Sequence, residues 1–164
     1  MIKNNNLLFT TIGVLLFQIL FVDFLTINFI RPDFLLIYVF YIAIIYGRVV
    51  AIVAAFFLGL LSDLFGVGSY FGLGPLTLST TAYLSGFLYN KYERLLPYVF
   101  HSIWTGILLL HFYINTYFRF QTIFISDILD FVTIWLTSFS YTMIFFLIMQ
   151  YFYPIKEASR AKIN

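Results

Sequence analysis

Residues 59–74 read GLLSDLFGVGSYFGLG and follow a nearly unbroken apolar run. The stretch contains one aspartate, Asp63, and five glycines. The apolar run predicts a helix, and the glycines indicate that a turn follows it. An aspartate in this position is either a working group inside a membrane or the polar end of a helix. The rest of the chain has to decide between these two interpretations.

The composition is that of a membrane protein. The 164 residues are 62% hydrophobic and only 10% charged, whereas a soluble domain has about 25% charged residues because its surface faces water. The chain contains no cysteine, which excludes disulfides, thiol catalysis and cysteine metal sites. We therefore expect an all-α, polytopic membrane protein with a single domain over residues 1–164.

The apolar stretches predict six transmembrane helices. A helix needs about 20 residues to cross the hydrocarbon core, so the second one is short and must extend into the interface or thin the bilayer. All four prolines lie at the edges of these segments, where a missing N–H is tolerated. The expected helices span residues 6–28, 33–47, 49–66, 73–90, 97–118 and 127–152.

The distribution of positive charge predicts the orientation. With six helices both termini share one side, which then holds seven of the nine Lys and Arg residues, and the other side holds only Arg31 and Arg119. The positive-inside rule places the richer side in the cytoplasm. We therefore expect both termini of this multi-pass protein in the cytoplasm. The aspartates, among them Asp23, Asp33 and Asp63, lie toward the outer side.

The depth of Asp63 argues against a site at the membrane centre. Asp63 lies 15 residues beyond Arg48, which is about 22 Å along a helix axis. A carboxylate in the outer third still needs a cavity, a bundle-facing site or a partner. Arg31 and Arg119 are the candidate partners, and we expect a polar outer pocket that contains Asp23, Arg31, Asp33 and Asp63. The alternative for Arg31, Pro32 and Asp33 is that they only form a charged helix start.

Small residues and Asp63 recur at intervals of four in the third helix. Ala51, Ala55, Gly59 and Asp63 therefore share one face. Small residues at this spacing let helix backbones approach closely in lipid. The face is either a docking surface for a helix of a partner or a packing surface among the helices of this chain.

The glycines after the third helix predict a tight outer turn. Gly66, Gly68, Gly72 and Gly74 allow positive φ and close backbone approach. A phosphate-binding loop is a poor interpretation, because no Lys-Ser/Thr ending follows and no strand precedes.

The remaining polar residues give no catalytic pattern. Ser126 or Asp127 is expected to cap the last helix, with Asp130 in its first turn, and the two aspartates are not expected to act as an acid/base pair. His101 and His111 lie about 80° and roughly 15 Å apart on one helix, so they cannot bind one metal together. We expect no enzyme activity, no cofactor and no metal.

Several short motifs resemble one known family. They are Arg31-Pro32-Asp33 at the start of the second helix, Gly59-Leu60-Leu61-Ser62-Asp63-Leu64 at the end of the third, Gly68-Ser69-Tyr70-Phe71-Gly72 in the turn, and Thr80-Thr81-Ala82-Tyr83-Leu84 in the fourth helix. Together they resemble the MreD family of bacterial rod shape-determining membrane proteins. The resemblance covers residues 31 to about 86. The chain departs from the family pattern at Thr80, which stands where a serine is usual, with Ser79 one place early.

The resemblance implies a function without catalysis. It implies an integral component of the cell-elongation (rod) complex in the bacterial inner membrane, which binds MreC and influences peptidoglycan synthesis and cell shape. The wider complex would include MreB, RodA and a class B penicillin-binding transpeptidase, with membrane lipids as further partners and no nucleic acid. The fold implied is that of the substrate-binding subunits of energy-coupling-factor transporters.

Two other functions compete with this one. A substrate-binding subunit of an energy-coupling-factor vitamin transporter would have the same length, but the first helix lacks the Ala-x-x-x-Ala pattern that commonly contacts the energising partner. An intramembrane hydrolase would have to use Asp23 and Asp63 as its acids, and no nucleophile or base motif accompanies them.

Overall fold

The computed structural model describes residues 4–28, 30–65 and 70–156. Within these ranges the regular structure is helical apart from one isolated bridge between Ile27 and Ile30, so the all-α class is confirmed. The elements are α1 (Asn4–Phe21), η1 (Asp23–Leu25), α2 (Phe34–Tyr46), α3 (Arg48–Leu64), α4 (Leu73–Ser85), η2 (Gly86–Leu88), α5 (Pro97–Arg119), α6 (Gln121–Ser126) and α7 (Ile128–Phe152), where η marks a 3-10 helix.

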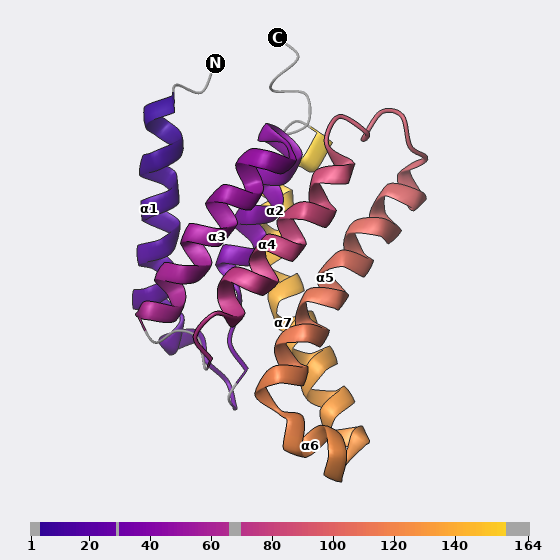
Figure 1. Ribbon diagram of the computed structural model, residues 1–164. Coiled ribbons are helices and arrows are strands. Elements are labelled where there is room, and N and C mark those ends of the chain that lie inside the picture. The colour runs from indigo at the N-terminus through magenta and orange to yellow at the C-terminus, as the bar shows by residue number, and fades with distance from the viewer. Residues whose placement is uncertain (1–3, 29, 66–69, 157–164) are drawn as a thin grey trace.

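The longer helices alternate in direction (Figure 1). The start of α1 and the end of α7 lie at the same end of the bundle, which we call the termini end. The connections from α1 to α2, from α3 to α4 and from α5 to α7 lie at the opposite end, which we call the loop end. The reversal from α2 to α3 at the termini end is tight, because the single residue Gly47 joins the two helices with a φ of 86°. Glycine adopts this left-handed backbone without strain.

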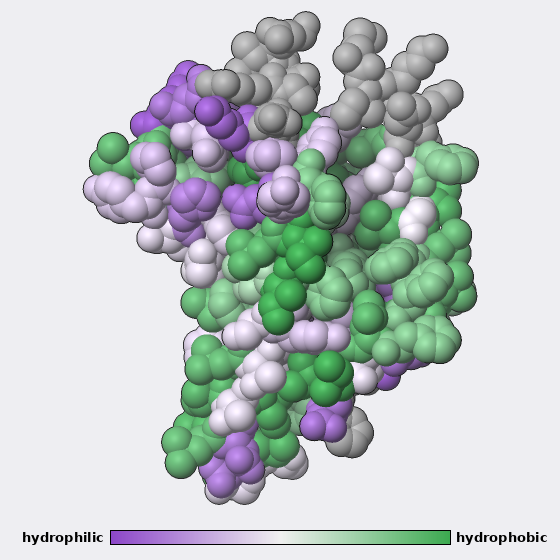
Figure 2. Space-filling model, turned by 180° about the vertical axis from the view of Figure 1, so that it is seen from behind, coloured by the Kyte–Doolittle hydropathy of each residue, from purple (hydrophilic) through white to green (hydrophobic). Residues whose placement is uncertain are grey.

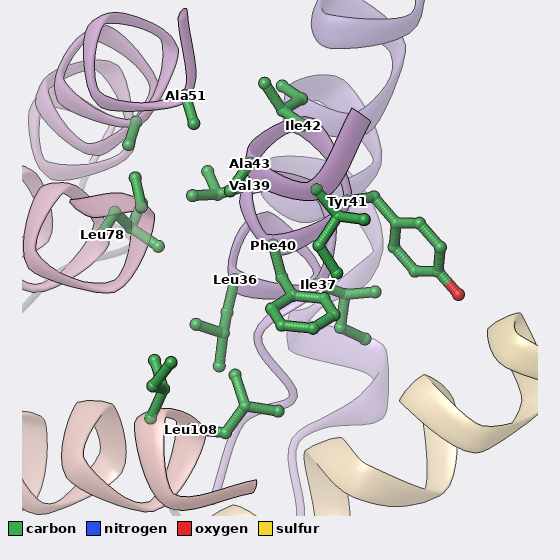
Figure 3. Close-up of a cluster of buried hydrophobic side chains, with 14 of the residues drawn as sticks. Leu36, Ile37, Val39, Phe40, Tyr41, Ile42, Ala43, Ala51, Leu78 and Leu108 are labelled. Carbon is green, nitrogen blue, oxygen red and sulfur yellow. The ribbon is translucent and has the colours of Figure 1, made fainter. Parts of the chain in front are cut away.

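The core is built around α2. Nine of its 13 residues are buried: Leu35, Leu36, Ile37, Val39, Phe40, Tyr41, Ile42, Ala43 and Ile44. A helix that is apolar on all sides is stable only when other helices surround it. Figure 3 shows Leu36, Val39 and Ala43 between the side chains of neighbouring helices, including Leu78 and Leu108. The surrounding helices therefore pack around α2.

The closest helix pair is α3 and α4. Ala51 and Ala55 on α3 are fully buried. A Cβ atom at Gly59 would collide with the backbone nitrogen of Pro75, and one at Gly86 would lie 2.6 Å from Cβ of Arg48. Close packing of this kind is the main source of helix association in lipid. Small residues at both ends of the contact therefore fix the spacing of α3 and α4.

The surface is apolar over large areas. Exposed large side chains include Phe57, Leu129 and Phe152. In the face that Figure 2 shows, hydrophobic residues cover most of the middle, and strongly hydrophilic ones gather toward the two ends. Among the described helices, α7 alone is long and apolar enough to cross a membrane by length and composition. Six transmembrane spans therefore stay a prediction.

Two features of the helices differ from the expected ones. The first helix ends at Phe21 instead of residue 28: η1 follows it, Thr26 is extended, and Asn28 has a φ of 46°. Asparagine tolerates this left-handed backbone better than other residues with a side chain. The second difference is α6, a short helix between Phe120 and Asp127 that was not expected.

The α3–α4 contact gives a test with a matched control. We expect Gly59→Ala to lower the free energy of unfolding by about 1–3 kcal/mol, because the new methyl group overpacks the helix contact. Gly106 lies on α5, where an added Cβ would meet no atom within 4 Å, so Gly106→Ala should keep or raise stability through helix propensity. Thermal unfolding in detergent measures both. Equal midpoints for the two variants would contradict the close approach at Gly59.

Candidate functional site

A polar cavity lies at the loop end of the bundle. Its volume is about 90 Å³, which is enough for several waters or the end of one side chain. It lies where α2 and α4 begin and where α3 and α5 end. Its polar lining residues are Gln18, Arg31, Asp33, Ser62, Asp63, Thr77, Asn115, Thr116, Arg119 and Ser138.

Asp63 connects the end of α3 to the start of α4. Its Oδ2 accepts hydrogen bonds from the backbone N–H groups of Gly72 at 2.7 Å and of Gly74 at 3.1 Å. The first N–H groups of a helix have no intrahelical acceptor, and a negative charge is favourable there. Gly72 has a φ of 95°, and a Cβ at Gly74 would lie 2.5 Å from Oδ1 of Asp63. Glycine is therefore needed at both positions.

Asp33 holds the start of α2. Its Oδ1 accepts from the backbone N–H of Leu36 at 2.8 Å, which makes it the N-cap. Its own N–H donates to Oγ1 of Thr142 on α7 at 3.2 Å. Gln18 on α1 donates to the carbonyl of Pro32 and accepts from the N–H of Phe34. Side chains from two other helices thus complete the hydrogen bonds of this buried helix start.

A buried histidine joins this cap to α4. His111 on α5 is 2% exposed, and its Nε2 lies 3.3 Å from Oδ2 of Asp33 and 2.9 Å from Nδ2 of Asn115. Its Nδ1 lies 2.9 Å from Oγ1 of Thr81. Because Thr81 Oγ1 donates to the carbonyl of Thr77, it accepts from Nδ1–H of His111. These hydrogen bonds satisfy the ring nitrogens of His111. Without them, burying the imidazole in an apolar bundle would cost free energy.

The two arginines at the cavity differ in their partners. Arg31 forms an ion pair with Asp23 at 3.5 Å, and both side chains are exposed. Arg119, the last residue of α5, has a buried Nε without a hydrogen-bond partner. It forms no ion pair with any residue in the described part of the chain. Arg119 therefore supplies unused N–H donors at a cavity whose two carboxylates are already engaged.

The cavity contains part of the expected polar pocket. Arg31, Asp33 and Asp63 line it, and Asp23 lies outside the lining, paired with Arg31. Gly72 and Gly74 lie at the turn bound by Asp63, and Gly66 and Gly68 fall outside the described residues. Of the face with Ala51, Ala55, Gly59 and Asp63, the part at Gly59 and Asp63 packs against α4 of the same chain, and Ala51 and Ala55 are buried. Asp127, not Ser126, caps α7, which confirms the predicted capping.

Sequence reasoning missed the residues that complete the site. Gln18, His111 and Asn115 were not assigned to it, although each is a strongly polar side chain within an apolar helix. Such residues in membrane segments usually face the bundle interior and have a partner, and this signal alone would have found them. His101 is separate from this network and accepts from Trp104 Nε1 at 2.8 Å. The described residues contain no cluster of His, Asp or Glu that could hold a metal ion.

The arrangement at Asp63 predicts a graded response to substitution. Asp63→Asn keeps an acceptor oxygen for Gly72 and Gly74 but loses the charge, which should cost about 1 kcal/mol of folding free energy. Asp63→Leu leaves the N–H groups of Gly72 and Gly74 without their acceptor and should lower the free energy of unfolding by about 3 kcal/mol. Thermal or denaturant unfolding in detergent measures the difference. If Asp63→Leu is as stable as the original protein, Asp63 does not anchor the turn.

Comparison with known proteins adds the family. The family model for rod shape-determining protein MreD matches residues 3–156. No curated protein and no solved structure matches the chain significantly. Proteins of this family are membrane proteins of the bacterial cell envelope, belong to the MreBCD rod-shape system, and are not known as enzymes. Because the match covers nearly the whole length, the chain belongs to the MreD family and has a role in rod shape determination.

Proposed function

We propose that the protein is a non-enzymatic, six-span subunit of the rod complex that binds MreC through its loop-end cavity. The single observation that carries this proposal is Arg119, whose buried Nε has no partner in a cavity with engaged carboxylates. An arginine in this state gains most from an acceptor brought by another molecule, since a charge-assisted hydrogen bond is stronger than a neutral one. The expected acceptor is a carboxylate or a backbone carbonyl from the membrane-proximal part of MreC.

The charge distribution supports a topology that puts this cavity outside the cytoplasm. Arg48, Lys91, Arg94 and Lys156 lie at the termini end, and Arg31 and Arg119 lie at the loop end. The positive-inside rule then places the termini end in the cytoplasm and the loop end outside. The short helices α2 and α4, with 13 residues each, require a locally thin bilayer or an extension such as η2.

This orientation connects the cavity to peptidoglycan synthesis. MreC is a single-span protein with a large extracytoplasmic part, so its membrane-proximal segment passes the loop end. Holding this segment at a fixed place would set the position of MreC relative to RodA and the class B penicillin-binding transpeptidase. At the opposite end, Lys91 and Arg94 in the α4–α5 connection are exposed and available to MreB or to anionic headgroups. Arg48 is less available, because its guanidinium stacks on Tyr83 and Phe87.

The size of the cavity favours a partner side chain over a vitamin. Pockets for small molecules usually have volumes of about 300–1,000 Å³, whereas this one has about 90 Å³. A transporter subunit would need a larger cavity than the loop end provides.

Co-purification with MreC tests the proposal. Detergent-extracted protein expressed beside MreC should retain MreC, and Arg119→Ala should reduce the retained amount about tenfold or more, since a charge-assisted hydrogen bond is lost. Arg94→Ala, which changes an exposed arginine at the other end, is the matched control and should retain MreC fully. The midpoint of thermal unfolding shows that each variant is folded. If the original protein never retains MreC, or if Arg119→Ala retains as much as Arg94→Ala, the proposal is wrong.

A further inference from the structure

A lateral groove runs along the bundle between α1 and α7. Its volume is about 540 Å³, several times that of the loop-end cavity. One face of α2 forms its floor, with Ile37, Tyr41 and Ile42. Gly13 and Phe17 of α1 form one wall, and residues of α7 such as Ile148 form the other. The groove extends from the level of Phe34 at the start of α2 to that of Tyr46 at its end, so it follows the whole helix.

The walls of the groove present almost only hydrocarbon. The hydroxyl groups of two of its tyrosines are engaged: that of Tyr38 lies 2.6 Å from Oγ1 of Thr11, and that of Tyr41 donates to the carbonyl of Tyr153 at 2.8 Å. Figure 3 shows Tyr41 on the side of α2 away from Leu78, and thus away from α4. An occupant gains apolar contacts here and finds few polar groups that need a partner. It must therefore be hydrocarbon along its length.

The groove is too small for another helix. Its floor residues Ile37, Tyr41 and Ile42 are only 4%, 6% and 2% exposed, so an occupant would contact mainly the walls formed by α1 and α7. A helix about 10 Å wide and as long as the 13-residue α2 has a volume on the order of 1,500 Å³, whereas the groove has about 540 Å³. A polymethylene chain is much thinner and can enter. On the α1 wall, a Cβ at Gly13 would meet no atom within 4 Å, so free space lies beside this residue.

A positive charge lies at the termini end of the groove. Tyr153 lines the groove, and two residues later Ile155 is 1% exposed and belongs to the core cluster. Lys156 is exposed and lies three residues after Tyr153, so its Cα is within about 11 Å of the Cα of a residue that lines the groove. A lysine at a membrane interface attracts anionic headgroups, and tyrosines are frequent at the same depth.

We propose that the groove between α1 and α7 binds one acyl chain of an anionic phospholipid, with its phosphate at Lys156. The apolar walls, the small volume and the nearby Lys156 together favour this ligand over a partner helix. The site is separate from the loop-end cavity proposed to bind MreC. In the orientation proposed above, the lipid would come from the inner leaflet, but the chemistry of the groove does not depend on that orientation.

Retention of phosphatidylglycerol in detergent tests the acyl-chain site. The purified protein is mixed with phosphatidylglycerol, exchanged into fresh detergent and examined by native mass spectrometry. Gly13→Phe fills the free space beside α1 and should retain about tenfold less lipid, as expected when the ring displaces a few methylene groups. Gly106→Phe places the same ring on α5, away from the groove and with no atom within 4 Å of its Cβ position, and should retain as much lipid as the original protein.

Two further variants complete the experiment. Ile148→Trp enlarges an exposed side chain on the α7 wall and should also lower retention, which covers the case that Gly13→Phe does not fold. Lys156→Glu should lower retention of phosphatidylglycerol but not of phosphatidylcholine. Equal retention by Gly13→Phe, Ile148→Trp and Gly106→Phe would overturn the proposal. If Gly13→Phe retains lipid normally but loses MreC, the proposal is also overturned, because the groove would then bind a helix.

Discussion

The buried start of α2 is the constraint on which the rest of the loop end depends. The first N–H groups of any helix lack intrahelical acceptors, and those of α2 lie among α1, α5 and α7, where side chains must supply them. Asp33 and Gln18 provide these acceptors. The second oxygen of Asp33 then faces His111, whose other nitrogen faces Thr81. Polar residues gather here because a backbone inside the bundle requires them.

The same reasoning makes the cavity better suited to binding an acceptor group than to catalysis. Asp63 is used by the first N–H groups of α4, and Asp33 by those of α2. A general acid or base has to be free to exchange a proton with a substrate, and neither carboxylate has that freedom. Arg119 is left with an Nε–H that has no partner. The cavity can therefore recognise an acceptor group, which is the property that an assembly protein needs at a contact with its partner.

Local sequence signals predicted the helices but not how their faces meet. The apolar runs and the prolines indicated where helices lie, and a cap at Ser126 or Asp127 was identifiable from position. The end of α1 was missed because the sequence stays mostly apolar beyond Phe21. The small-residue face of α3 was identifiable, but its partner α4 was not, since spacing does not say which helix packs there. The lateral groove depends on the distance between α1 and α7, and no residue pattern within either helix encodes that distance.

The loop-end cavity and the lateral groove share the contact between α1 and α2. Gln18 lines the cavity and accepts from the backbone N–H of Phe34, and the ring of Phe34 lines the groove. Phe17, the neighbour of Gln18, packs edge-on against Phe34 within the groove. A shift of α1 relative to α2 would thus change the shape of both sites at once. Because α1 has few buried residues besides Leu15 and Gln18 among those described, it is held more weakly than α3 or α4. An acyl chain between α1 and α7 would add apolar contact where the bundle has least, and would steady the residues that shape the cavity.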